Sequence, residues 1–302
     1  MTAVGVQLPE VERPYAWSEV REIARTAEAV GLDSVWVGDH LLYRDESGSR
    51  GPWEAWSALA GLAEATERVL IGPLVAATAF HNPAMLAKKA ATVDEMSGGR
   101  LVLGLGAGWN QTEFDAFGFP FDRRVARFEE AFTIIRTLLT DGAIDFDGEF
   151  HTLRGMELVP PARPDLPILI GSNGPRMLAA TLPHVDAWNT WYTSYGNTPD
   201  GLAELVGLVD RVCDEVGRER ADIERTAAVY VHAPDAGARA SGGRNDTSVP
   251  AITGSAEAVA DRLAAIAAVG IEHLQVVLDP IDARSVEWLG SVREHVGPPG
   301  LR

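Results

Sequence analysis

One short segment of the chain places a carboxylate beside an imidazole. Asp39 and His40 directly follow the apolar run at 34–38. A histidine exchanges protons near neutral pH, and an adjacent carboxylate can orient it or raise its pKa. Neighbouring residues of an extended chain point in opposite directions, so adjacency does not by itself pair the two side chains. The dipeptide indicates either a proton-transfer site or a histidine that only satisfies a loop carbonyl.

A second segment is rich in glycine. Gly104, Gly106 and Gly108 alternate with Leu and Ala after another apolar run, and the third position of a G-x-G-x-x-G dinucleotide fingerprint is Trp109. That fingerprint is therefore absent. Glycines allow the backbone to approach a flat ligand closely, and they also serve tight turns. Both interpretations follow from the pattern.

The third segment, residues 170–176, reads Ile-Gly-Ser-Asn-Gly-Pro-Arg and precedes a helical pattern. Small residues expose backbone N–H groups, a helix N-terminus carries partial positive charge, and Arg176 adds a full charge. The segment predicts a phosphate-binding loop. The alternative is a glycine-rich connection that ends in a surface arginine.

Several other kinds of chemistry are disfavoured. The seven histidines show no metal-binding H-x-H or H-E-x-x-H spacing, and Cys213 is the only cysteine, so one chain cannot build a disulfide or a thiolate zinc site. The net charge of −17 disfavours nucleic acid and anionic membranes as partners. No apolar run is long enough to span a bilayer, and the N-terminus lacks a basic region followed by an apolar one. We expect a cytoplasmic protein without a membrane span.

Eight apolar runs alternate with stretches of helical period from end to end. Near-continuous apolar runs are typical of parallel strands covered on both faces. The predicted strands are Val4–Leu8, Ser34–Gly38, Val69–Leu74, Leu101–Leu105, Ile168–Ile170, Ala187–Thr190, Ala227–Val231 and His273–Val277. The pattern favours an α/β fold, a single (β/α)8 TIM-like barrel over residues 1–302, with a doubly wound open sheet as the alternative.

Two segments interrupt the repeat. Residues 141–167 contain two turn signals around short apolar runs and predict an inserted hairpin. Residues 233–252 are rich in Gly, Ala, Asp and Ser and follow the seventh predicted strand. Barrel enzymes carry their chemistry at the C-terminal ends of the strands, so this second insertion is a candidate lid.

The three segments, in this order and with these neighbours, resemble the luciferase-like monooxygenase superfamily, in particular its branch that uses the deazaflavin coenzyme F420. The resemblance covers nearly the whole chain. It is carried by SVWVGDH at 34–40, IGPLVAATAFHNPAMLAKKAATVDEMSGGRLVLGLGAGWNQTEFDAFG at 71–118 and PILIGSNGPRMLAATLPHVDAWNT at 167–190.

The resemblance implies roles for individual residues. Leu74 and Val75 match a non-prolyl cis peptide behind the middle of the flavin ring, and the loop after the fourth strand lies along the cofactor. The matching loop residues are Ala107, Gly108, Trp109 and Asn110; those at the cofactor phosphate are Gly171, Ser172, Asn173 and Gly174, with Arg176 as a helper. His40 is the expected proton donor or acceptor, with Asp39 beside it, and a homodimer is expected.

The cofactor expected from the resemblance is F420, with FMN as the alternative, because Gly38-Asp39-His40 is similar to the F420 branch whereas FMN enzymes more often have Glu-His. Trp109 and Arg44 stand where F420-dependent sugar-phosphate dehydrogenases have Glu and Trp, so a sugar phosphate is not expected. The predicted function is hydride transfer between F420 and a small organic substrate. The alternatives are an FMN-dependent monooxygenase and a flavin-binding protein without turnover.

Other residues are assigned structural roles. Arg100 in the SGGR turn is expected to support the fold, and Glu113 to fix the start of a helix. Trp188, Trp191 and Tyr192 flank the end of the sixth predicted strand. They predict either an aromatic wall beside the cofactor ring or packing at the strand end.

Overall fold

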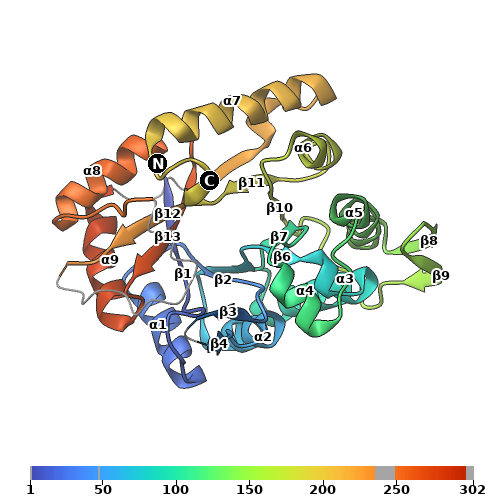
Figure 1. The fold of residues 1–302 in the computed structure, drawn as a ribbon, viewed down its shortest axis with the longest axis horizontal. Helices are drawn as coiled ribbons and strands as arrows, with labels where there is room; N and C mark the ends of the chain where they lie inside the picture. Colours follow the sequence, from blue (N-terminus) through green and yellow to red (C-terminus); the bar gives the residue numbers. More distant parts are fainter. Residues whose placement is uncertain (1, 47, 235–248, 297–302) are drawn as a thin grey trace.

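Parallel strands run around the centre of the molecule, and helices cover them from outside (Figure 1). The computed structural model describes residues 2–46, 48–234 and 249–296. Within these residues, a nine-stranded sheet has the order β5-β2-β1-β13-β12-β11-β10-β7-β6. Its strands are β1 (Ala3–Gln7), β2 (Ser34–Val37), β5 (Leu70–Pro73), β6 (Ala76–Ala77), β7 (Leu103–Gly106), β10 (Ile168–Gly171), β11 (Ala187–Thr190), β12 (Glu224–His232) and β13 (His273–Asp279). All eight predicted strands are present.

The sheet closes on itself between its third and fourth barrel strands. The Ile71 amide donates to the carbonyl of Arg100 (3.0 Å), and the Val102 amide donates to the carbonyl of Ile71 (2.9 Å). β5 pairs with β2 whereas β6 pairs with β7, and the Leu74–Val75 peptide bond between β5 and β6 is cis. The third barrel strand is thus divided at the predicted cis peptide, and the prediction of a TIM-like barrel is confirmed.

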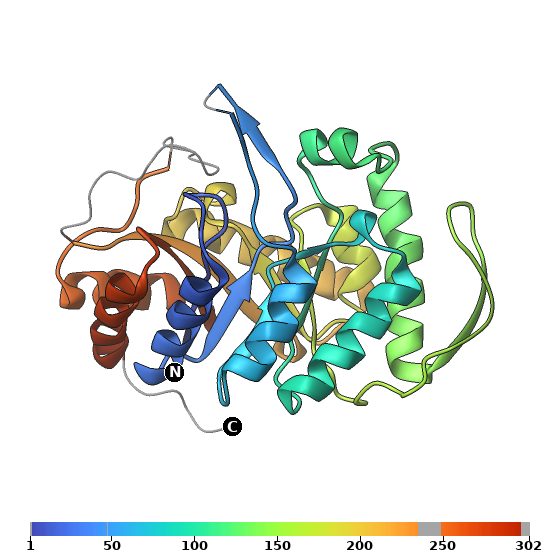
Figure 2. The ribbon, with the colours of Figure 1, turned by 90° about the horizontal axis from the view of Figure 1, so that it is seen from below.

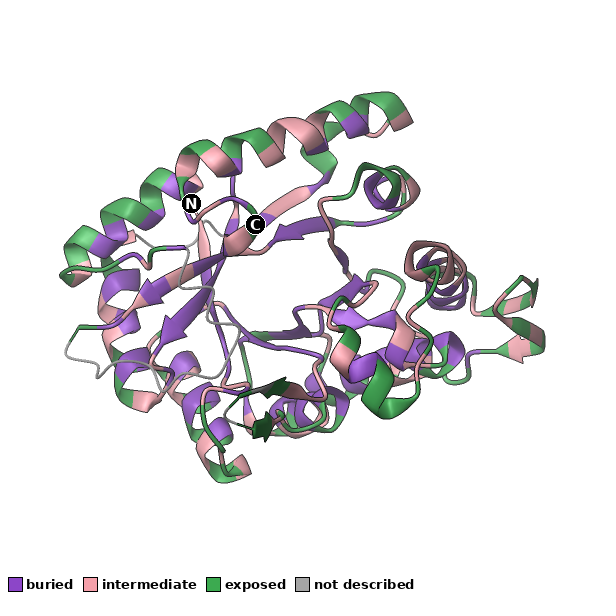
Figure 3. Cartoon of the chain, viewed as in Figure 1, coloured by how far each residue is buried: buried purple, intermediate pink, exposed green. Residues whose placement is uncertain are grey.

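The helices bury one face on the sheet and expose the other (Figure 3). In the described chain they are α1 (Trp17–Ala29), α2 (Ala55–Ala65), α3 (Pro83–Ser97), α4 (Gln111–Phe117), α5 (Arg124–Asp141), α6 (Pro175–Thr181), α7 (Pro199–Val216), α8 (Ala256–Ala267) and α9 (Ala283–Val296), with three 3-10 turns at Thr78–Phe80, Tyr192–Ser194 and Arg220–Asp222. Side-chain oxygens of Asn82, Thr198 and Ser255 cap α3, α7 and α8. None of the described helices combines the length and apolar character needed to cross a membrane.

Within the described residues, two antiparallel hairpins lie outside the barrel. β8 (Ala143–Asp147) pairs with β9 (Thr152–Glu157) beside α5, which confirms the hairpin predicted within 141–167 (Figure 1). β3 (Tyr43–Asp45) pairs with β4 (Gly48–Arg50) and extends away from the barrel (Figure 2). This second hairpin was not predicted, because its three-residue strands carry no apolar alternation.

The second predicted insertion, the candidate lid at 233–252, lies mostly outside the described residues. Where the described chain resumes, the Ile252 amide donates to the Tyr230 carbonyl (2.9 Å) and the His232 amide donates to the Ile252 carbonyl (2.9 Å). The segment therefore returns to β12, the strand from which it departs.

Arg100 has the structural role expected of it. Its guanidinium donates to the carbonyls of Ala63, Thr66, Val69 and Ser97 and to the Thr66 hydroxyl, at 2.7–2.8 Å. These acceptors lie at the end of α2, before β5 and at the end of α3. One side chain thus fixes the approach to the two strands between which the barrel closes.

Candidate active site

A cavity of about 380 Å³ opens at the C-terminal ends of the barrel strands. This volume is within the range of small-molecule and cofactor sites. Most of the predicted site residues line it, namely Asp39, His40, Leu74, Val75, Ala107, Gly108, Trp109, Gly171, Ser172 and Asn173. The three separate segments of the sequence therefore meet at one place.

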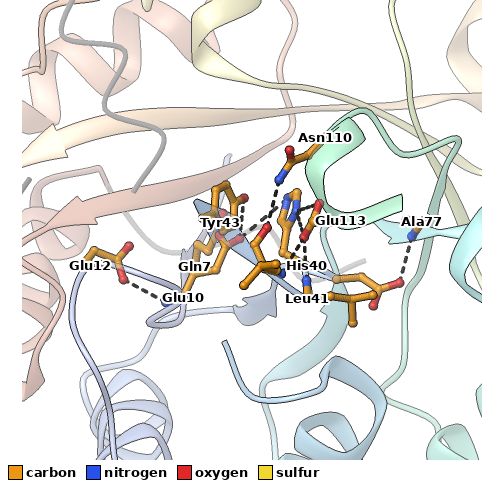
Figure 4. Close-up of polar contacts among 11 residues, drawn as sticks. Gln7, Glu10, Glu12, His40, Leu41, Tyr43, Ala77, Asn110 and Glu113 are labelled. Atoms are coloured by element: carbon orange, nitrogen blue, oxygen red, sulfur yellow. Dashed lines mark hydrogen bonds and ion pairs between the residues drawn. The ribbon is translucent and has the colours of Figure 1, made fainter. Parts of the chain in front are cut away.

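His40 is held at the cavity wall by Glu113 of α4. Nδ1 of His40 lies 3.0 and 3.1 Å from the two carboxylate oxygens of Glu113 (Figure 4). A carboxylate can only accept, so Nδ1 donates its proton and Nε2 is the nitrogen left for exchange with a ligand. Glu113 also accepts from the amides of Leu41 (2.6 Å) and Leu42 (3.1 Å), which fixes the chain after His40.

Glu10 approaches the other side of the imidazole. Its Oε1 lies 3.7 Å from Nε2 of His40 and accepts from the Tyr43 hydroxyl (2.9 Å), while its Oε2 accepts from Nε2 of Gln7 (3.0 Å). A side chain at Gly38 would collide with this carboxylate, since an added Cβ would lie 2.9 Å from Cδ of Glu10. Glycine at position 38 therefore makes room for Glu10 beside His40.

The two carboxylates determine the protonation of His40. Burial opposes its charged form, but Glu10 and Glu113 outweigh burial and raise the pKa of His40 above its ordinary value. Burial also favours the neutral form of Glu113, but His40 and the amides of Leu41 and Leu42 lower the pKa of Glu113. Burial raises the pKa of Glu10 against the opposing effect of His40. Glu113 is thus the ionised partner, and Glu10 retains its proton more readily.

Asp39 does not contact the His40 ring; it points the other way, as alternation on an extended chain allows. Its Oδ2 accepts from the amide of Ala77 (2.9 Å) and from Nε2 of His81 (2.8 Å). Nζ of Lys89 lies 3.4 Å from Nδ1 of His81. An ammonium only donates, so Nδ1 accepts and the proton of His81 is on the nitrogen facing Asp39. Asp39 therefore anchors β6 rather than orienting His40 by direct contact.

The glycines of β7 and β10 surround one side chain, that of Val75. A Cβ added at Gly106 would lie 2.7 Å from Cγ2 of Val75, and one added at Gly171 would lie 2.9 Å from both Val75 methyls. At Gly104 an added Cβ would lie 2.2 Å from the Pro73 carbonyl and 2.9 Å from Cγ1 of Val75. The sequence pattern is compatible with a tight βα turn and with close approach to a ligand. The structure adds a third, because these glycines make space for the cis Leu74–Val75 segment.

Substitution of Gly106 by alanine is expected to lower the free energy of unfolding by about 1–3 kcal/mol, because the new methyl overpacks the space occupied by Val75. Urea unfolding followed by circular dichroism measures this. Gly207→Ala in the middle of α7 is the matched control. There an added Cβ meets only the Arg211 guanidinium at 3.6 Å, and alanine favours the helix. Equal stability of the Gly106→Ala protein and its parent would contradict the packing role.

Three predicted residues lie outside the cavity wall. Nδ2 of Asn110 donates to the Leu42 carbonyl (3.1 Å), which joins the loop after β7 to the chain after His40. Gly174 precedes α6, and its amide donates to the Ser172 hydroxyl (3.2 Å). Arg176 is exposed, and its guanidinium is bound by both carboxylate oxygens of Glu129 (2.6 and 2.7 Å). Of the predicted phosphate loop, residues 171–173 face the cavity.

Aromatic side chains complete the wall. Trp191 and Tyr192 line the cavity. Trp188 is fully buried, and its indole N–H donates to the Ser172 carbonyl (2.8 Å), so it supports the 171–174 loop from behind. The Trp109 ring lies 5.7 Å from that of His40, edge to face. Trp188 therefore packs behind the strand end, whereas Trp191 and Tyr192 lie on the cavity wall, where a role beside the cofactor ring stays a prediction.

Two of the site's carboxylates, Glu10 and Glu113, were not identified from the sequence as partners of His40. Glu113 is separated from His40 by 73 positions, and the sequence favoured a role at the start of a helix, with substrate contact as the alternative. Its place in the chain could have identified Glu113 as a site residue, because it lies in the first helical turn after β7, at the C-terminal end of the barrel strands where barrel enzymes carry their chemistry. Glu10 could have been identified in the same way, because it follows β1 at the same end of the barrel.

Comparison with known proteins identifies the family. The family model for luciferase-like monooxygenases matches residues 2–242. The chain is 38% identical over 159 residues to the F420-dependent glucose-6-phosphate dehydrogenase of Amycolatopsis mediterranei, a match that covers 51% of this chain and 47% of that protein. It is 35% identical over 161 residues to the 5,10-methylenetetrahydromethanopterin reductase of Archaeoglobus fulgidus, covering 53% and 45%. The chain thus matches less than half the length of either relative.

The fold is shared with solved structures as well. An F420-dependent secondary alcohol dehydrogenase, solved in complex with an F420-acetone adduct, superposes with a TM-score of 0.83 at 22% identity, covering 98% of this chain and 99% of that one. At this identity the likeness shows the fold alone. The family model spans most of the chain, and the cis peptide and the His40 segment lie where the family resemblance expects them. The chain belongs to the luciferase-like monooxygenase family.

Proposed function

We propose that the protein is an F420-dependent oxidoreductase that transfers a hydride between the deazaflavin cofactor and a small organic substrate. The observation that carries the proposal is His40, held by Glu113 so that Nε2 is available at a cavity walled by the cis Leu74–Val75 segment. The choice of cofactor is supported by the names of two similar proteins: the dehydrogenase of Amycolatopsis mediterranei and the solved secondary alcohol dehydrogenase are both F420-dependent.

The cavity wall fits a planar, polar cofactor ring. Among the described residues, Oε1 of Gln7, Oδ1 of Asn173 and Nε1 of Trp191 are buried atoms without a hydrogen-bond partner, and all three side chains line the cavity. The pyrimidine edge of a deazaflavin carries both carbonyl and N–H groups that can satisfy such atoms. Leu74 and Val75 would support the middle of the ring, and Ala107, Gly108 and Trp109 would lie along it.

The phosphate of the cofactor is assigned to the 171–174 loop, with Asp39 and Asn110 holding the neighbouring segments in place. When bound, F420 supplies a ring that accepts or donates a hydride. His40 then holds or releases a proton at Nε2 as the substrate oxygen gains or loses one. Glu113 keeps Nδ1 protonated throughout, and the rings of Trp109 and Tyr43 lie beside the imidazole (ring distances 5.7 and 4.9 Å).

The 171–174 loop can be tested without disturbing the fold. Gly174 has an ordinary φ of −79° and an added Cβ would meet only the Ser172 hydroxyl, at 3.8 Å. Gly174→Val is therefore expected to preserve stability but to weaken F420 binding by about tenfold or more, because it adds bulk beside the phosphate (tenfold is about 1.4 kcal/mol). Arg176→Ala is the comparison, with a smaller effect, because Glu129 already binds that guanidinium. Unchanged affinity in both variants would place the phosphate elsewhere.

A turnover screen tests the proposed function. The protein is mixed with oxidised F420 and a panel of alcohols, or with reduced F420 and a panel of ketones, while the deazaflavin absorbance and the oxygen concentration are followed. Hydride transfer changes the absorbance without consuming oxygen. Oxygen consumption with reduced FMN would instead favour the monooxygenase, and tight F420 binding without turnover of any compound would favour a binding protein.

The homodimer that the family resemblance implies is part of this proposal. Light scattering after size-exclusion chromatography measures the mass in solution directly, and the chain mass of 32.4 kDa makes a monomer and a dimer easy to distinguish.

A further inference from the structure

Arginines gather around the first turn of α5, and their charges are compensated differently. The guanidinium of Arg123 is paired with Glu149, and that of Arg127 with Asp122. Arg124, between them, forms no ion pair within the part of the chain that the structure describes; its contacts there are with a backbone carbonyl and an aromatic ring. Its positive charge is therefore available to an anion from outside the chain.

Arg124 is held against the wall of the cavity. Its Nη1 donates to the carbonyl of Gly108 (2.9 Å), and Gly108 lines the cavity. Its guanidinium carbon lies 4.1 Å from the centre of the Phe121 ring, a favourable cation–π contact. The side chain is only partly buried, and a guanidinium has further N–H donors besides the one bound to Gly108. Arg124 thus combines a fixed position with donors left for a ligand.

This position is on the side of the cavity to which the cofactor phosphate is assigned. Arg124 is the first residue of α5, which follows β7 and α4. β7 pairs with β10, the strand that leads into the 171–174 loop. α5 and α6, the helices beyond these strands, are neighbours (Figure 1), and the ion pair of Glu129 with Arg176 joins them. The start of α5 and the phosphate loop therefore share one side of the barrel mouth.

The phosphate loop has no charge of its own. Its four residues, at 171–174, are Gly-Ser-Asn-Gly, and among the described residues no lysine or arginine lines the cavity. Arg176, just after the loop, is already bound by both carboxylate oxygens of Glu129. F420 carries a phosphate followed by carboxylates, and anions of this kind form their strongest hydrogen bonds with charged donors. The start of α5 offers such a donor in Arg124.

We propose that Arg124 receives the anionic tail of F420 where the tail leaves the cavity beside the 171–174 loop. The proposal rests on the proposed function and adds to it a residue that distinguishes the complete cofactor from its ring alone. One N–H group keeps the Gly108 carbonyl in place, and the others bind phosphate or carboxylate oxygens. Support of the loop after β7 through Gly108 alone is the competing role, and the experiment separates the two.

The experiment compares F420 with its deazaflavin riboside, which has the ring but neither the phosphate nor the tail, in fluorescence titrations. Arg124→Met keeps an apolar stem over Phe121 and removes the charge. The Kd of F420 is expected to rise at least about fivefold, and that of the riboside to change less than about twofold, because only F420 has an anion to lose its partner. Arg124→Lys keeps a positive charge and a donor for Gly108, so it should restore most of the affinity for F420.

Arg123→Met is the matched control. It removes the same charge one position away, from a guanidinium that is already paired with Glu149, and should leave both Kd values near those of the parent. Equal weakening of F420 and the riboside by Arg124→Met would assign Arg124 to the support of Gly108 and contradict the proposal. Unchanged affinity for F420 would contradict it as well, and so would an equal loss in Arg123→Met, which would assign the effect to net charge.

The two ligands also distinguish this inference from the function on which it rests. If the parent binds neither F420 nor the riboside, the cavity is not a deazaflavin site and both proposals are wrong. If the parent binds both and Arg124→Met leaves the ratio of the two Kd values unchanged, the deazaflavin site stands and only the tail site is wrong.

Discussion

His40→Ala is expected to lower the rate of substrate oxidation or reduction by about 10²–10⁴, the usual contribution of a positioned general acid or base. The physical reason is that Nε2 of His40 is the exchangeable nitrogen at the cavity, since Nδ1 is committed to Glu113 (3.0 Å). The affinity for F420 should change much less. Steady-state kinetics with a substrate found in the screen, together with an F420 titration, measure both quantities.

A matched control for His40→Ala is His184→Ala. His184 is exposed, lies outside the cavity and has its ring near Phe132. Its replacement should leave turnover near that of the parent. Turnover of the His40→Ala protein at the parent rate would remove His40 from the mechanism.

Substitution of Glu113 should have the second largest effect. Glu113→Gln is expected to lower turnover by about 10–10²-fold while the KM changes less, because the amide cannot stabilise a protonated imidazole as a carboxylate does. Glu113→Ala should also lower the free energy of unfolding by about 1–3 kcal/mol, because the partly buried amides of Leu41 and Leu42 lose their acceptor. Kinetics across a pH series and urea unfolding measure the two effects.

The pH profile separates a positioning role of Glu113 from a merely structural one. In the parent the carboxylates of Glu10 and Glu113 raise the pKa of His40 above its ordinary value. Removing one of them lowers that pKa. Carbonyl reduction requires protonated His40, so the limb where its rate falls with rising pH should move to lower pH. Alcohol oxidation requires neutral His40, so the limb where its rate rises should also move to lower pH. If neither limb moves in the Glu113→Gln protein, Glu113 does not set the pKa of His40.

The barrel could be predicted because each of its strands is recognisable from a short run of its own sequence. Strands covered on both faces appear as near-continuous runs such as Val4–Leu8 and His273–Val277, and the structure has a strand at each predicted run. The β3–β4 hairpin could not be predicted, because Tyr43–Asp45 and Gly48–Arg50 lack apolar alternation and are held by pairing with each other.

The candidate site was predictable only in part, because its decisive contacts are distant in sequence. Asp39 is the neighbour of His40 in the chain, yet it is bound to Ala77 and His81, whereas Glu113 reaches His40 across 73 positions. The glycines of β7 and β10 could be identified as special, but the reason, the side chain of Val75, appears only when the strands are assembled. The position of the cis peptide came from the family resemblance.

The most direct test of the account is an equilibrium titration of the purified protein with F420 and, in parallel, with FMN, followed by the absorbance and fluorescence of each cofactor. We expect saturable binding of F420 with a lower Kd than that of FMN, and weaker F420 binding by Gly174→Val. Tighter binding of FMN than of F420, or saturable binding of neither, would contradict the central claim that this cavity is a deazaflavin site.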